Sequence, residues 1–82
     1  MKTSEDIYNR VMTDPLLNKN FFTLLYWDGI KQQHLEIPIT KWIPPQKGGI
    51  IPWHRVYFIK FNGNIIWDRE KRICEINSCI LD

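Results

Sequence analysis

The dipeptide Asn62-Gly63 is the feature that most constrains the fold of this chain. It lies between two short runs that are rich in β-branched and aromatic residues. A two-residue type I′ turn needs positive φ at both positions, which Asn and Gly tolerate, so the dipeptide predicts a tight antiparallel hairpin. Counting outward from the turn gives the register, and Phe58 is expected opposite Trp67.

The predicted register divides the charged residues of this hairpin between the two faces of the sheet. Arg55 is expected opposite Glu70 and diagonal to Asp68, and a cross-strand ion pair is the simplest interpretation of that arrangement. His54 and Arg69 become diagonal neighbours on the other face, with no carboxylate between them. This pair is therefore predicted to be the better candidate for contacting an anion.

Composition bounds the class of protein. The chain has 82 residues, of which 44% are hydrophobic and 24% charged, and its net charge is +2. These values predict a single folded domain over residues 1–82 with a modest core. The mild charge means that any nucleic-acid contact must come from local clustering of basic residues. The polar start and the lack of a long apolar run predict no membrane association and an intracellular, cytoplasmic or nuclear, location.

The N-terminal region predicts a helix. Thr3 or Ser4 can serve as its N-cap, two acidic residues follow in the first turn, and Asp14-Pro15 ends it near Thr13. The apolar residues within this segment fall on one helical stripe: Ile7, Tyr8, Val11 and Met12.

A first hairpin is predicted between the helix and the loop that precedes the Asn62-Gly63 hairpin. Residues 21–27 form a β-type run, Asp28-Gly29 is a plausible turn, and residues 33–39 alternate in polarity. Pro38 indicates an edge strand or a bend. The predicted fold class is therefore α+β, with an N-terminal helix packed on a small antiparallel sheet of about four strands built from two hairpins.

Catalysis would have to use the two histidines. His34 and His54, with a lysine such as Lys41 or Lys60, would suffice for a small metal-independent ribonuclease or phosphodiesterase. The two histidines lie on different predicted hairpins, and no spacing brings them together, so we assign no catalytic residue. The residues also show no metal-ligand spacing and no phosphate-binding glycine loop, so no metal and no cofactor are expected. The two cysteines, Cys74 and Cys79, match no zinc pattern and are expected to be free thiols.

A binding function needs fewer coincidences. Phosphate recognition uses Arg or Lys with a further donor, and base recognition uses an exposed aromatic face. The hairpin and its entrance supply these groups in His54, Lys60, Arg69, Trp53 and Trp67. Each tryptophan has an alternative interpretation as a core residue. Tyr26 and Asp28, near the first turn, are most simply an aromatic residue and a turn-former.

Several segments together resemble a known family. They are Ile51-Pro52-Trp53-His54-Arg55-Val56, then Lys60, Gly63, Trp67-Asp68-Arg69 and Arg72, preceded by Tyr26-x-Asp28 and by Glu36-x-Pro38 ahead of Trp42. This pattern looks like the RNA cyclic group end recognition domain family, whose members occur alone or fused to nucleotidyltransferase, phosphodiesterase-like and zinc-finger modules of RNA processing. The resemblance covers most of the chain. It departs from the family at Gly29, where an arginine tends to follow the Tyr-x-Asp element.

The resemblance implies a role for seven residues of this chain: Tyr26, Asp28, His54, Arg55, Lys60, Asp68 and Arg69. Together with the residue pattern it predicts a non-catalytic RNA-binding module that recognises 3′ ends bearing a phosphate or a 2′,3′-cyclic phosphate. RNA and RNA-processing proteins are the expected partners. A small ribonuclease or phosphodiesterase and a protein-interaction domain are the alternatives.

Overall fold

The computed structural model describes residues 2–79 and begins with a single α-helix, α1 (Ser4–Thr13). Thr3 is its N-cap: the Thr3 hydroxyl accepts from the Asp6 N–H, and the Asp6 carboxylate accepts from the Thr3 N–H. This reciprocal capping satisfies two backbone donors that the helix start would otherwise leave without partners. Ile7, Tyr8 and Val11 are buried against the sheet and Met12 is partly buried against the same core, which confirms the predicted stripe.

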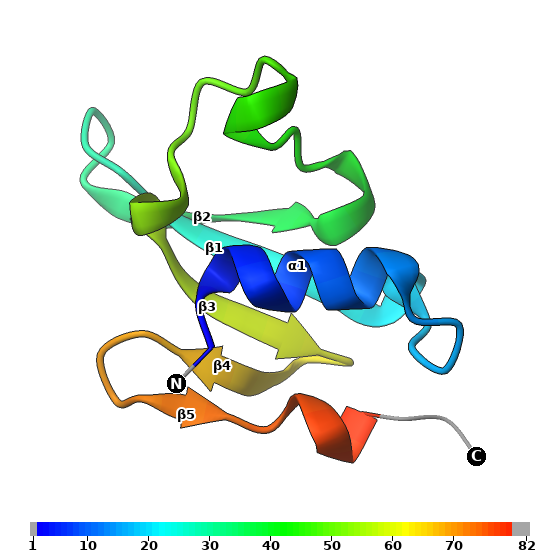
Figure 1. The fold of residues 1–82 in the computed structure, drawn as a ribbon. Helices are drawn as coiled ribbons and strands as arrows, with labels where there is room; N and C mark the ends of the chain where they lie inside the picture. The colour runs from blue at the N-terminus through cyan, green and yellow to red at the C-terminus, as the bar shows by residue number, and fades with distance from the viewer. Residues whose placement is uncertain (1, 80–82) are drawn as a thin grey trace.

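The helix lies across one face of an antiparallel sheet (Figure 1). The described residues form five strands: β1 (Phe22–Asp28), β2 (Gln33–Pro38), β3 (Val56–Phe61), β4 (Asn64–Asp68) and β5 (Ile73–Cys74). Their order in the sheet is β2-β1-β3-β4-β5. The predicted α+β class is confirmed, with one short strand more than expected, and β2, which contains Pro38, is an edge strand.

The connection from β2 to β3 is the longest in the chain, because β3 pairs with β1 on the side opposite β2. It contains three short 3₁₀ helices: η2 (Ile39–Lys41), η3 (Pro45–Lys47) and η4 (Trp53–Arg55). In Figure 1 it crosses above the β2 edge and returns through η4, the yellow-green turn beside the β1–β2 loop. The connection therefore brings the residues before β3 to the end of the sheet where β1 stops.

The Asn62-Gly63 turn is confirmed as a two-residue hairpin loop, with φ of 50° at Asn62 and 87° at Gly63. Phe61 pairs with Asn64 and Lys60 with Ile65, as the count from the turn predicts. A β-bulge then shifts the register, so that Ile59 pairs with Trp67 and Phe58 with Asp68.

The predicted pairing of Phe58 with Trp67 is therefore wrong. The bulge inserts Ile66 into β4, and a one-residue shift moves every side chain beyond it to the other face. Ile66 is 4% exposed and Trp67 is 1% exposed, so both enter the core beneath the helix. The shift thus lets β4 bury two successive large side chains.

The hydrophobic core lies between α1 and the sheet. On the sheet it is built from buried residues of the three central strands, among them Phe22, Leu24, Val56, Ile59 and Trp67. Side chains that alternate with these lie on the opposite face of the sheet. Leu25 and its partner Phe58 belong to this second face, and both are only partly buried.

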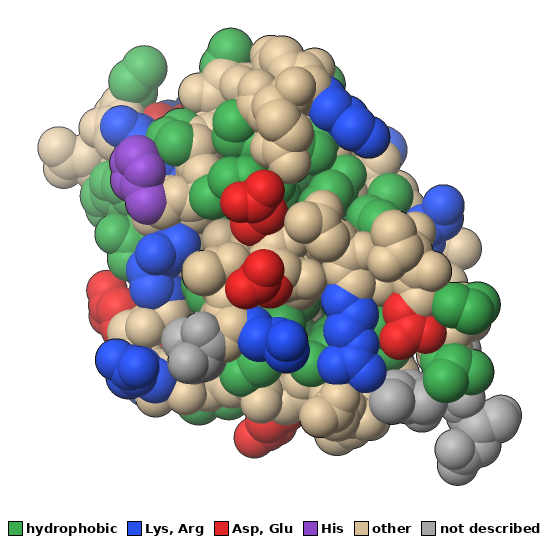
Figure 2. All heavy atoms as spheres, viewed as in Figure 1, with side chains coloured by type: hydrophobic (Ala, Val, Ile, Leu, Met, Phe, Trp, Pro, Cys, Tyr) green, Lys and Arg blue, Asp and Glu red, His purple; other side chains and the backbone are tan. Residues whose placement is uncertain are grey.

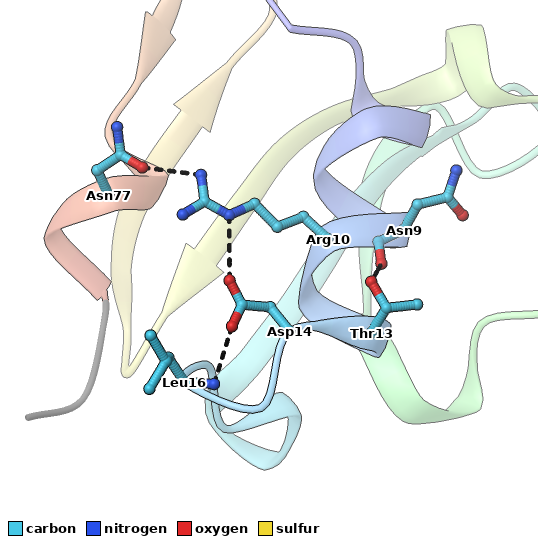
Figure 3. Close-up of polar contacts among 6 residues, drawn as sticks. All are labelled: Asn9, Arg10, Thr13, Asp14, Leu16 and Asn77. Atoms are coloured by element: carbon cyan, nitrogen blue, oxygen red, sulfur yellow. Dashed lines mark hydrogen bonds and ion pairs between the residues drawn. The ribbon is translucent and has the colours of Figure 1, made fainter.

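The end of the helix is tied to the C-terminal part of the described chain (Figure 3). Arg10 forms an ion pair with Asp14, with 3.5 Å between Nε and Oδ2, and its Nη1 donates to Asn77 Oδ1 at 2.8 Å. Asn77 belongs to η5 (Ile76–Cys79), which follows β5. A further 3₁₀ helix, η1 (Lys19–Phe21), lies earlier in the chain and leads into β1.

Within residues 2–79, Cys74 and Cys79 are both free thiols, as predicted. Burial raises the pKa of the Cys79 thiol. None of the helices in the described part of the chain combines the length and apolar character needed to cross a membrane.

Candidate functional site

A cleft opens at the end of the sheet where β1 stops and β3 begins. Tyr26 pairs with Val56, so the residues that follow Tyr26 lie beside the residues that precede Val56. The cleft is lined by Tyr26, Trp27, Asp28, Gly29 and Ile30 on one side and by Ile50, Ile51, Pro52, His54 and Arg55 on the other. Its volume of about 690 Å³ falls within the usual range for small-ligand sites.

The basic wall of the cleft is formed by η4. His54 and Arg55 are its last two residues, and both side chains are exposed. Arg55 Nη1 lies 3.6 Å from the position that a Cβ on Gly29 would occupy, so the guanidinium lies against the β1–β2 turn. This position corrects the predicted ion pair of Arg55 with Glu70 and Asp68, since no salt bridge of Arg55 is found within residues 2–79. The β-bulge and the 3₁₀ turn together carry Arg55 away from β4.

Asp28 places a carboxylate on the opposite wall. Its Oδ1 accepts from the backbone N–H groups of Ile30 at 2.9 Å and Lys31 at 3.1 Å, which shapes the β1–β2 turn. The hydrogen bond from Lys31 and that from Ile30 hold the pKa of Asp28 below its ordinary value, and the charges of Lys31 and Arg55 lower it further. Asp28 is therefore an ionised group that lies within electrostatic range of Arg55 and keeps the turn closed.

Arg69 supports the basic wall from behind. Its Nη2 donates to the Trp53 carbonyl at 2.8 Å and its Nε to the Val56 carbonyl at 2.9 Å. Ser4 Oγ, from the helix, donates to the same Trp53 carbonyl at 3.2 Å. The structure thus reverses the predicted arrangement of the two arginines, because Arg69 is held by backbone carbonyls while Arg55 faces the cleft.

Exposed hydrophobic side chains form the rim of the cleft. Trp27 is 36% exposed, Ile30 is 96% exposed and Ile50 is 95% exposed. Exposed apolar groups around a polar centre are typical of a binding site. Sequence reasoning missed Ile30 and Ile50, because single isoleucines in two different loops carry no local signal and only the β1–β3 pairing brings them together.

Three other predicted site residues lie outside the cleft. Trp67 is 1% exposed and its indole N–H donates to the Lys2 carbonyl at 2.8 Å, so it packs in the core and offers no face to a base. Trp53 is partly buried between the rings of Tyr8 and Trp42, with centroids 5.4 Å and 5.6 Å away. Lys60 lies on the second face of the sheet, where its Nζ is 3.9 Å from Glu36 Oε1.

Asp68 is another residue for which the resemblance implies a functional role, and in the structure it forms a turn. It is 3% exposed, and its Oδ1 accepts from the N–H groups of Glu70 and Lys71 at 3.0 Å each. It therefore closes the β4–β5 turn. Of the predicted residues, the structure brings Tyr26, Asp28, His54 and Arg55 together.

The surface around the cleft is mixed in charge. Figure 2 shows a histidine, basic side chains and hydrophobic side chains close together near the end of the molecule where Figure 1 has η4 and the β1–β2 loop, whereas acidic and basic groups alternate over the helix. His34 does not line the cleft. Among residues 2–79 there is no cluster of three metal-binding side chains.

Comparison with known proteins gives one family and no structural neighbour. No solved structure matches this chain. A family model described as the MJ1316 RNA cyclic group end recognition domain matches residues 1–69, which include the helix, the first four strands and every residue of the cleft. The match covers most of the 82 residues. The chain therefore belongs to the MJ1316 RNA cyclic group end recognition domain family.

Proposed function

We propose that this domain binds RNA 3′ ends that carry a phosphate, preferring a 2′,3′-cyclic phosphate, and that the terminal phosphate lies against His54 and Arg55. The observation that carries the proposal is the position of these two exposed side chains on one wall of a cleft in a chain of this family. A cyclic phosphate has one negative charge and two free oxygens. One arginine and one further donor can saturate it.

The acidic wall favours the cyclic end over the open one. A cyclic phosphate is a monoanion, whereas an open terminal phosphate carries a charge of about −1.5 to −2 at pH 7, because its second pKa is near 6. Asp28 is ionised at this pH, since its pKa lies below the ordinary value. Repulsion from Asp28 grows with ligand charge and therefore penalises the dianion more than the monoanion.

The apolar rim suits the rest of the terminal nucleotide. Trp27, Ile30 and Ile50 border the polar centre and are exposed. An indole offers a π-face on which any base can stack. A base resting against this rim would place its ribose phosphate toward η4, so we expect little selectivity among the four bases.

Binding without catalysis fits the placement of the two histidines. A ribonuclease of the kind considered from the sequence needs two acid–base groups within reach of one phosphate. His54 lines the cleft, while His34 lies in β2 on the second face of the sheet, in ring contact with Phe58 at 5.1 Å between centroids. We therefore assign His54 to binding and expect the isolated domain to leave RNA intact.

The test uses short RNAs of one sequence that differ only at the 3′ end: cyclic phosphate, open phosphate or hydroxyl. Fluorescence-anisotropy titrations should rank their affinities in that order, and electrophoresis of the recovered RNA should show no cleavage. Equal affinity for all three ends would contradict end recognition. Turnover that is lost on His54→Ala would replace the binding function with a nuclease.

A further inference from the structure

The second face of the sheet carries a cluster of rings that begins at the cleft. Trp27 lines the cleft and also pairs with His34, with 5.2 Å between ring centroids. His34 in turn lies 5.4 Å from Tyr57 and 5.1 Å from Phe58. These four residues, which we call the aromatic track, extend from β1 and β2 onto β3, so they lead away from the cleft across the sheet.

The aromatic track is separate from the hydrophobic core. Trp27 and His34 are exposed and Tyr57 and Phe58 are only partly buried. The partly buried residues that do pack against the core, such as Tyr26 and Trp53, lie on the helix side, and no ring of the track is among them. Packing of the core thus does not account for four neighbouring rings on this face.

Positive charge lies beside the track. The Arg69 guanidinium carbon is 5.7 Å from the centre of the Tyr57 ring, within the range of a cation–π contact. The same carbon is 5.5 Å from the ring of the buried Trp67, so Arg69 lies at the Tyr57 end of the cluster. Arg55 lines the cleft together with Trp27, where the track begins. Lys60 stands at the other end, where Glu36 balances it. Aromatic rings with cations at their margins are typical of surfaces that bind single-stranded nucleic acid.

We propose that the aromatic track binds the nucleotides that precede the RNA 3′ end, by stacking their bases on His34 and Tyr57 while the terminal phosphate occupies the cleft. The inference rests on the proposed function, because the cleft sets where the strand begins. The occupant is single-stranded RNA, since the track is continuous through Trp27 with the cleft that Arg55 lines. Duplex RNA hides its base faces and would not fit this mode.

The experiment varies RNA length at constant end chemistry. The full chain is titrated with adenosine 2′,3′-cyclic phosphate and with oligoadenylates of two, three and four nucleotides that end in the same cyclic phosphate. Affinity should rise by about fivefold or more for the second nucleotide, which corresponds to the lower end of base–aromatic stacking. His34→Ala and Tyr57→Ala should remove most of this rise. Because the ring of His34 contacts Trp27 at the cleft, the affinity of each variant for longer RNA is compared with the affinity of the same variant for the mononucleotide.

Two control variants make the outcome specific. His34→Phe keeps a ring at the centre of the track and should preserve the length dependence. Ile43→Ala removes an exposed apolar side chain from the β2–β3 connection, outside both the cleft and the track, and should change nothing. Thermal melts of every variant identify losses of affinity that come from unfolding. If His34→Ala unfolds, the length dependence of binding is compared between Tyr57→Ala and the folded variant His34→Phe.

The possible failures are distinguishable. If the mononucleotide binds and longer RNAs bind no better, the track is overturned while the cleft stands. If neither the mononucleotide nor any oligonucleotide binds, the proposed function falls and the track with it. Sedimentation that shows a dimer dissociated by Tyr57→Ala would make this face a protein interface and overturn the inference.

Discussion

Replacing Arg55 with glutamine tests the assignment of the cleft. The substitution removes the cationic fork and keeps a polar side chain of similar reach. A hydrogen bond to a charged group contributes about 1.5 to 3 kcal/mol, which corresponds to a roughly ten- to hundredfold loss of affinity. Arg55 is exposed and the cleft is open, so the lower part of this range applies, and we expect about a tenfold loss for RNA with a 3′ cyclic phosphate.

Stability should hardly change in the same variant. The side chain of Arg55 forms no salt bridge within residues 2–79. The 3₁₀ helix η4 is held instead by the backbone N–H of Arg55, which donates to the Pro52 carbonyl at 3.1 Å. Exposed substitutions of this kind stay within about 0.5 kcal/mol. The salt dependence of RNA binding should fall by about one unit of slope.

The assay is fluorescence anisotropy over a series of salt concentrations, accompanied by thermal melts. Arg72→Gln is the matched control, because Arg72 is an exposed arginine in the β4–β5 turn and does not line the cleft. Equal losses of affinity in the Arg55 and Arg72 variants would mean that binding depends on overall charge. A lower melting temperature with unchanged affinity in Arg55→Gln would refute the placement of the guanidinium in the cleft.

Three further substitutions examine the surroundings of Arg55. Arg69→Ala removes the donor to two backbone carbonyls and should destabilise the domain by about 1 to 2 kcal/mol, seen in urea denaturation; an unchanged midpoint would contradict its supporting role. Gly29→Arg adds a cation beside Arg55, because a Cβ at residue 29 would lie 3.6 Å from Arg55 Nη1. Anisotropy should show a several-fold higher affinity for RNA with a 3′ phosphate in this variant and no such gain in Gly29→Gln. Equal affinities of the two variants would contradict the binding of a phosphate at this position. Asp28→Asn preserves a turn-forming residue and removes the negative charge. It should raise the affinity for RNA with an open 3′ phosphate and so reduce the preference for the cyclic phosphate. In the wild type the preference for the cyclic phosphate should also decrease between pH 7 and pH 5, because the open phosphate takes up its second proton. A preference that changes neither with Asp28→Asn nor with pH would contradict repulsion of the open phosphate by Asp28.

The local features of the fold were predictable because their signals are local. Asn62-Gly63 predicted a turn whose geometry depends on two residues. Thr3 or Ser4, followed by two acidic residues, predicted the helix start, and the structure has Thr3 as the N-cap. The β-bulge in β4 was missed, although the run Ile65-Ile66-Trp67 breaks the alternation that a regular strand would show. Strand β5 was missed because two residues, Ile73–Cys74, are too short to form a pattern.

The candidate site depended on long-range pairing, which the residues alone do not reveal. Tyr26 and Asp28 meet His54 and Arg55 because β3 pairs with β1 after a long connection, and no spacing within either segment predicts that contact. The resemblance to the family named these residues, while the register count favoured Arg69. The count failed because it extended a regular ladder through the bulge.

The measurement that tests the central claim most directly is the location of the ligand on the protein. Backbone amide resonances of the full chain should be followed by NMR during titration with adenosine 2′,3′-cyclic phosphate. The largest shifts are expected at four residues of the cleft: Gly29, Ile30, His54 and Arg55. Shifts concentrated at the Asn62-Gly63 turn, or no shifts at ligand concentrations far above those at which longer RNA saturates the protein, would contradict binding of the terminal phosphate in this cleft.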